Sequence, residues 1–234
     1  MDPSHFDKLN DLKAKLPENV RRQFEKKFPQ LMANMDPAYS NWNSVKEEGD
    51  FKLFNRKDEG FVTQRAHMES NHNIESLIPL FKNIENRLKY DQVIEESEVI
   101  QKQSENFQIL RSQIKGKFMV ISPRDFVTYN VSGWLDKDTF LDMHFTPDDF
   151  EHPKTKAVRA YCDTIATIFK RAGDHKTIID SYSRVDPDLK MVPQSFVEKG
   201  SKDSGYLIKY FSDFADKTIH KPHHAHHPHE AHHK

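Results

Sequence analysis

Six strand-like runs follow one another between residues 93 and 185 and are joined only by short connections. They read VIEESEVIQKQS, NFQILRSQI, KFMVISPRDFVTYNVS, TFLDMHFT, AVRAYCDTIATIFKR and KTIIDSYSRV. Parallel strands need crossover connections of a dozen or more residues, whereas antiparallel strands can be joined by brief turns. This half of the chain therefore predicts one large antiparallel sheet.

The first half of the chain mixes helical and strand-like segments. Val20, Phe24 and Phe28 share one face of a predicted helix, LPENVRRQFEKKFPQLMANM. Three strand-like pieces follow it: NWNSVKEEG, DFKLFNRKDEG and FVTQRAHMES. A second helix is predicted over NIESLIPLFKNIENRLKY, with Asn73 as its N-cap, and we expect Pro79 to break or bend it.

The last helix-like segment, residues 192–219, carries an apolar stripe. The stripe consists of Phe196, Val197, Leu207, Tyr210, Phe211 and Phe214. An apolar helix face and an apolar sheet face must cover each other, so the pattern predicts an α+β fold in which the sheet packs on this helix. Gly200 and Gly205 weaken the helix by roughly 0.5–1 kcal/mol each relative to Ala. Alanine at both positions is therefore predicted to raise thermal stability.

Composition limits the class of protein. The chain has 234 residues, with 35 Lys and Arg against 36 Asp and Glu, so its near-neutral charge gives no indication of nucleic-acid binding. The single cysteine, Cys162, excludes an internal disulfide and fits a reducing compartment. The N-terminus lacks the apolar run of a signal peptide, and no run of 18 apolar residues occurs. We therefore expect a cytoplasmic protein.

Residues 220–234, HKPHHAHHPHEAHHK, hold eight of the 14 histidines and no apolar side chain larger than Ala. We expect them to form a disordered tail after a folded domain at residues 1–219. Imidazoles on a flexible chain chelate transition metals, but the tail lacks the fixed ligand geometry of a structural zinc site. Metal binding, docking of a partner and pH-dependent attraction to anionic lipid stay open as roles of the tail.

Several motifs, in their order, resemble the START (steroidogenic acute regulatory protein-related lipid transfer) family. They are SPRDFV, then AVRAYCDTIATIF, then DSYSRVDPDLKMVPQSFVEK, together with YDQVIEESEVIQKQSENFQI and Trp42 near the first strand. The resemblance covers about residues 15–219. It implies a helix-grip fold, in which a curved antiparallel sheet wraps around a long C-terminal helix and encloses a lipid-sized cavity.

Strand alternation, combined with this resemblance, predicts which residues line the lipid-binding cavity. The candidates are Phe126, Thr128, Asn130, Ala160, Cys162, Thr164, Leu207, Tyr210, Phe211 and Phe214. For each of them ordinary core packing is the competing interpretation. Cholesterol-binding members of the family carry a buried Arg where this chain has Asn130, so the match to that subgroup is weaker. Arg124 and Asp125 are interpreted first as a strand-end ion pair without a ligand role.

The resemblance implies binding of a single lipid, a phospholipid in the first place, and its transfer between membranes by a monomer in transient contact with the membrane surface. A sterol carrier is the alternative within the family, and a lipid-gated sensor or scaffold is the alternative outside it. We expect no enzyme activity and no cofactor, because no paired acid and base is recognisable and His67, His72, His144 and His175 are scattered along the chain. Cys162 fits a small buried hydrophobe better than a nucleophile.

Overall fold

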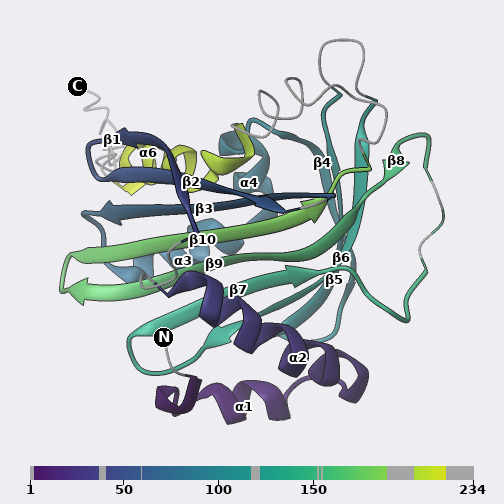
Figure 1. Ribbon diagram of the computed structural model, residues 1–234. Coiled ribbons are helices and arrows are strands. Elements are labelled where there is room, and N and C mark those ends of the chain that lie inside the picture. Colours follow the sequence, from purple (N-terminus) through teal and green to yellow (C-terminus); the bar gives the residue numbers. More distant parts are fainter. Residues whose placement is uncertain are drawn as a thin grey trace, which may run out of the picture.

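The computed structural model describes residues 3–36, 41–58, 60–116, 122–151, 153, 155–188 and 203–219. Within them one curved sheet is covered by helices on both faces (Figure 1). The described helices are η1 (Pro3–His5), α1 (Leu9–Ala14), α2 (Glu18–Met35), α3 (Ile74–Lys82), α4 (Ile84–Tyr90) and α6 (Leu207–Ile219). Residues 189–202, which include most of the first half of the last predicted helix, and the predicted tail lie outside the described residues.

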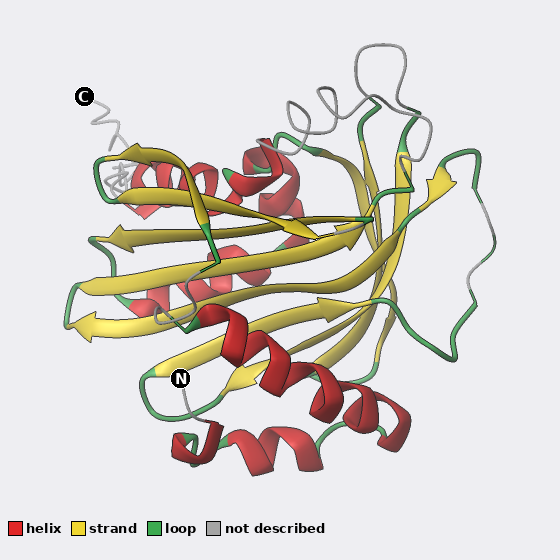
Figure 2. Cartoon of the chain, in the orientation of Figure 1, coloured by secondary structure: helices red, strands yellow, loops and turns green. Residues whose placement is uncertain are grey.

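The sheet contains ten described strands. They are β1 (Asn43–Glu48), β2 (Phe51–Asp58), β3 (Phe61–Ser70), β4 (Ile94–Lys102), β5 (Phe107–Ile114), β6 (Arg124–Trp134), β7 (Thr139–Phe145), β8 (Val158–Arg159), β9 (Tyr161–Gly173) and β10 (Lys176–Asp186). Their spatial order is β1-β2-β3-β10-β9-β7-β6-β5-β4, with β8 beside β6. Every pair is antiparallel except β6 with β8. The predicted antiparallel sheet is confirmed, and Figure 2 shows how it bends between β10 and β4.

The two faces of the sheet carry separate cores. On the outer face, α1 and α2 pack on β5, β6, β7 and β9, where Phe24 and Phe28 of α2 are buried together with Tyr129 and Met143 of the sheet. On the inner face lie α3, α4 and α6 (Figure 1). Strands with both faces covered bury every residue, and β6 is buried from Arg124 to Gly133 for this reason.

Helix α3 begins at the predicted cap, since the Asn73 side chain accepts a hydrogen bond from Ser76 N at 2.8 Å. The predicted break comes later than expected. Pro79 is accommodated inside α3, and the chain turns at Asn83, whose extended backbone ends α3 and whose side chain caps α4 by accepting from Asn86 N. A proline removes one helical hydrogen bond, but here a full cap at the next helix determines where the chain turns.

The Arg124–Asp125 motif opens β6, and its two side chains point to opposite faces of the sheet. Arg124 donates hydrogen bonds to the backbone carbonyls of Ser122, Pro187 and Asp188. Asp125 pairs with Arg111 and with Arg159, at 3.0 Å and 2.9 Å. The prediction of a strand-end ion pair between these two neighbours is therefore wrong. Their side chains point to opposite faces of the sheet and bind different partners.

Candidate functional site

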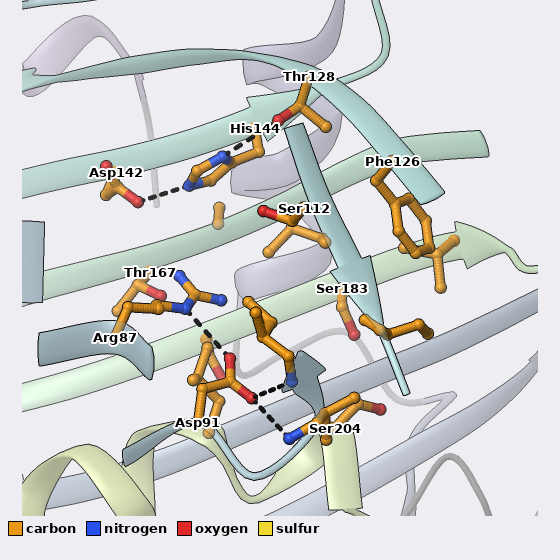
Figure 3. Close-up of a pocket in the computed structure, with 18 of the residues that line it drawn as sticks. Arg87, Asp91, Ser112, Phe126, Thr128, Asp142, His144, Thr167, Ser183 and Ser204 are labelled. Atoms are coloured by element: carbon orange, nitrogen blue, oxygen red, sulfur yellow. Dashed lines mark hydrogen bonds and ion pairs between the residues drawn. The ribbon is translucent and has the colours of Figure 1, made fainter. Parts of the chain in front are cut away.

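A cavity of about 240 Å³ lies between the inner face of the sheet and helices α3, α4 and α6 (Figure 3). Its wall is mostly apolar and includes Leu110 and Ile114 of β5, Ile165 of β9 and Phe81 of α3. Many of the lining residues are polar or charged, although most of the exposed wall surface is apolar. The arrangement is typical of ligand pockets, in which apolar contacts supply affinity and a few polar groups set orientation.

Alternation along β6 places three of the predicted lining residues on the cavity wall. Phe126, Thr128 and Asn130 all line the cavity, and Leu207 of α6 lines it from the helix side. These four residues line the cavity, as the sequence pattern predicted. Whether they contact a bound lipid stays a prediction.

Strand β9 departs from simple alternation because it contains a β-bulge. Arg184 pairs with Thr164 while Val185 pairs with Cys162, so Asp163 is an extra residue in β9. The bulge reverses the inward parity, and Ile165 and Thr167, rather than Thr164, line the cavity.

Ala160 and Cys162 precede the bulge. Their side chains point toward the inner face of the sheet, as predicted, but do not line the cavity. Both are buried in a small cluster with Phe126, packed behind Ile114, Ile165 and Val185. Burial raises the pKa of the Cys162 thiol, which fits a buried hydrophobe and not a nucleophile.

The aromatic residues predicted on the last helix lie beside the cavity and not on its wall. Phe211 is fully buried, with its ring centroid 5.1 Å from that of Phe81 and 6.1 Å from that of Phe169. Tyr210 and Phe214 pack against the same apolar cluster. This part of α6 is held to the sheet by close aromatic packing.

A chain of hydrogen bonds crosses the cavity wall. Gln108 Nε2 donates to Asn130 Oδ1 at 2.9 Å, and Asn130 Nδ2 donates to Asp142 Oδ1 at 2.9 Å. His144 Nε2 lies 2.8 Å from Asp142 Oδ2, and His144 Nδ1 lies 3.5 Å from Thr128 Oγ1 (Figure 3). An ionised carboxylate only accepts hydrogen bonds, so Nε2 of His144 carries a proton.

Asp142 is the acceptor on which this chain converges. Burial by itself disfavours its charged form, but His144, Asn130 and the nearby Arg87 together hold the pKa of Asp142 below its ordinary value. The carboxylate is therefore ionised at neutral pH, although it lies inside the protein.

A second polar group comes from α4. Arg87 Nε donates to Asp91 Oδ2 at 3.1 Å, and Asp91 Oδ1 accepts from the backbone N–H groups of Val93 and Ile94 (Figure 3). Burial works against the charge of Arg87, but Asp91 and Asp142 keep its pKa above the ordinary value. A guanidinium that is only 19% exposed thus lies in the cavity wall, paired with Asp91 and within electrostatic range of Asp142.

The contact between Asp142 and His144 was not predicted from the sequence. No paired acid and base was expected, whereas Asp142 and His144 lie in contact on β7 and face the cavity. The two residues are two apart in a strand, which puts them on one face, and that spacing was the available signal. In the described part of the chain, no group of three or more metal-ligating side chains is placed to hold a metal ion.

The fold can be compared with known proteins now that the site is described. No family model matches the sequence, and no curated protein matches it. Human StAR-related lipid transfer protein 5 aligns with a TM-score of 0.74 at 18% identity, covering 87% of this chain and 98% of that protein. The chain has the START-domain fold.

Two further START-domain structures support this assignment. Human STARD10 aligns with a TM-score of 0.72 at 18% identity over 88% of this chain and 82% of its own. The lipid transfer and protein localization domain of human StarD13 aligns with a TM-score of 0.58 at 15% identity over 82% and 95%. The helix-grip architecture implied by the sequence motifs is confirmed. No helix in the described residues is long and apolar enough to cross a membrane.

Proposed function

We propose that this protein binds one lipid in the cavity and carries it between membranes. The observation that carries the proposal is the mostly apolar cavity enclosed between the sheet and helices α3, α4 and α6. Each Å² of apolar surface that a ligand buries there contributes about 25 cal/mol before entropy costs. At about 240 Å³ the cavity is smaller than the usual ligand pocket, roughly 300–1,000 Å³, so it holds one ligand at most.

The structural relatives support a lipid ligand. One is named a StAR-related lipid transfer protein, and another is a lipid transfer and protein localization domain. At 18% and 15% identity they share the fold with this chain, and the ligand is our inference from the cavity. We propose that the protein acts in the cytoplasm as a monomer and touches the membrane surface only while it loads or unloads.

A phospholipid is the class that the charges of the wall favour. The described lining includes five cationic side chains, Arg65, Lys82, Arg87, Lys115 and Arg124, and two carboxylates, Asp91 and Asp142. This excess of positive charge suits a phosphate group. A sterol, with one hydroxyl group, is the alternative, and it would have to use Asn130 in place of the buried Arg of cholesterol-binding START proteins.

We propose a binding role for the Asp142–His144 pair and no covalent step. Its hydrogen bonds to Asn130 and its contact with Thr128 make it part of the cavity wall, where it can orient a polar group of the ligand. Affinity then comes from the apolar wall, and this pair and Arg87 orient the part of the ligand that lies within the cavity.

Native mass spectrometry of the purified protein, with identification of extracted lipids, tests the proposal. A retained phospholipid supports it, and a retained sterol supports the alternative. Transfer is tested by mixing donor vesicles carrying a fluorescent phosphatidylcholine or a fluorescent sterol with unlabelled acceptors. A protein that retains no lipid and transfers neither probe would contradict the proposal and point to a scaffold.

A further inference from the structure

A second pocket lies outside the cavity, between the turn that joins α3 to α4 and the turn that joins β4 to β5. Its volume is also about 240 Å³, and its lining is mostly polar. Asn83 contributes from the first turn, Lys102, Ser104 and Glu105 from the second, and Ser132 from β6. We refer to it as the outer pocket.

The outer pocket and the cavity share part of one wall. Lys82, Gln108 and Asn130 line both of them. The hydrogen bond from Gln108 Nε2 to Asn130 Oδ1, 2.9 Å long, closes this wall. These shared side chains therefore form the wall between an apolar space and a polar one.

The cations of the outer pocket are available to an anion. Lys82 Nζ uses one N–H on the backbone carbonyl of Glu105, at 3.0 Å, and an ammonium group has three. Lys102 pairs with the Glu105 carboxylate at 2.8 Å, but the two side chains are 54% and 82% exposed. Such exposed pairs are worth little, so a bound anion can replace Glu105 at Lys102.

The geometry points to a head-group site: the outer pocket binds the phosphate or carboxylate of a lipid whose apolar chain lies in the cavity and passes the wall at Gln108 and Asn130. This inference rests on the proposed lipid binding and adds the position and charge of the head group. It assigns Lys82 and Lys102 as the residues that select anionic lipids over neutral ones with the same chain.

Isothermal titration calorimetry with dodecyl phosphate and with dodecanol tests the inference, because the two ligands share the chain and differ in the head group. The variant is Lys102→Met in the full chain, because Lys102 lines the outer pocket and not the cavity. The control is Lys89→Met, an exposed lysine of α4 that lines neither space. We expect Lys102→Met to bind dodecyl phosphate about tenfold more weakly and dodecanol as before, and the control to match the original protein.

Three outcomes overturn the inference. Unchanged binding of dodecyl phosphate in Lys102→Met removes this lysine from the site, and equal loss in the control shows a general effect of charge. Inorganic phosphate that binds as tightly as dodecyl phosphate, without competition by dodecanol, identifies a free-anion site separate from the cavity. If neither chain ligand binds and no lipid is retained or transferred, lipid binding itself fails, and that result differs from the other three.

Discussion

At the scale of single residues, one buried carboxylate joins several segments of the chain. Asp125 is completely buried and accepts hydrogen bonds from Arg111 of β5, Arg159 of β8 and Thr155 before β8. Three polar partners surround its two oxygens, so the charge is compensated although water is excluded. This explains how a carboxylate can stand near the start of a strand that is buried almost throughout.

We predict that Asp125→Asn lowers the free energy of unfolding by about 3–5 kcal/mol, because it leaves Arg111 and Arg159 without their shared buried carboxylate. Urea denaturation measures the loss. Glu96→Gln is the matched control, since Glu96 also bonds Arg111 but its side chain is 60% exposed. The control should change stability by no more than about 0.5 kcal/mol. Equal losses in the two variants would refute the special role of the buried carboxylate.

At the scale of elements, the bulge in β9 separates cavity wall from close-packed core. Ser183 of β10 pairs with Ile165 beyond the bulge and lines the cavity, whereas Ala160 before the bulge is packed in a cluster. We predict that Ser183→Phe fills the cavity, weakens lipid binding about tenfold or more and leaves stability within about 1 kcal/mol.

Ala160→Trp provides the contrast to Ser183→Phe. It should lower the free energy of unfolding by about 1–3 kcal/mol, because the added ring has no empty space to enter. Lipid binding and urea denaturation of both variants, with Ser183→Ala as the size control, check the pair. Full lipid binding by Ser183→Phe would show that the ligand does not occupy this part of the cavity.

Close packing at Gly205, just before α6, argues against the stability gain that the sequence predicts for alanine at this position. A Cβ atom on Gly205 would lie 2.5 Å from Leu53 Cδ1, and Leu53 is fully buried. We therefore expect Gly205→Ala to lower the free energy of unfolding by about 1–3 kcal/mol, contrary to the gain expected from helix propensity. In a Leu53→Ala background the loss should be smaller, because the clash is removed. A stability gain in the original background would support the propensity argument. Gly200 lies outside the described residues.

At the scale of the whole molecule, several carboxylates couple stability to pH. Burial alone would raise their pKa values, but hydrogen bonds and cations lower the pKa values of Asp58, Asp142, Asp149 and Asp180 on balance. A lowered pKa in the folded state means that the folded protein binds fewer protons than the unfolded chain. The resulting stability is present above the unfolded pKa of about 3.9 and is lost as the pH falls through the folded values.

We therefore predict a free energy of unfolding that is nearly constant from about pH 7 to 5 and falls steeply below about pH 4. Urea denaturation at constant ionic strength across this range measures it. Asp180→Asn should reduce the slope below pH 4, because Asp180 loses its pairing with His67 and Lys170. A stability that stays flat down to pH 3 would contradict the prediction.

The sequence by itself determined most elements, because they depend on local patterns. The nine strand-like runs correspond to the ten strands, except that AVRAYCDTIATIFKR is divided into β8 and β9 and that β6 begins at Arg124, later than its predicted run. The helical spacing at Val20, Phe24 and Phe28 matches α2, and Asn73 caps α3 as expected. Alternation along β6 also predicted which of its side chains face the cavity, namely Phe126, Thr128 and Asn130. These features follow from hydrogen-bond geometry and side-chain periodicity within one segment.

Only the tertiary structure decided which residues share a surface. The bulge at Asp163 moves the cavity wall from Thr164 to Ile165, and a bulge shows itself only in the pairing with the neighbouring strand. Arg87 of α4 meets the cavity beside Asp142 of β7 only because the helix packs on the inner face of the sheet. Such contacts join residues far apart in the chain, and their energies depend on burial and mutual distance, which a local pattern does not contain.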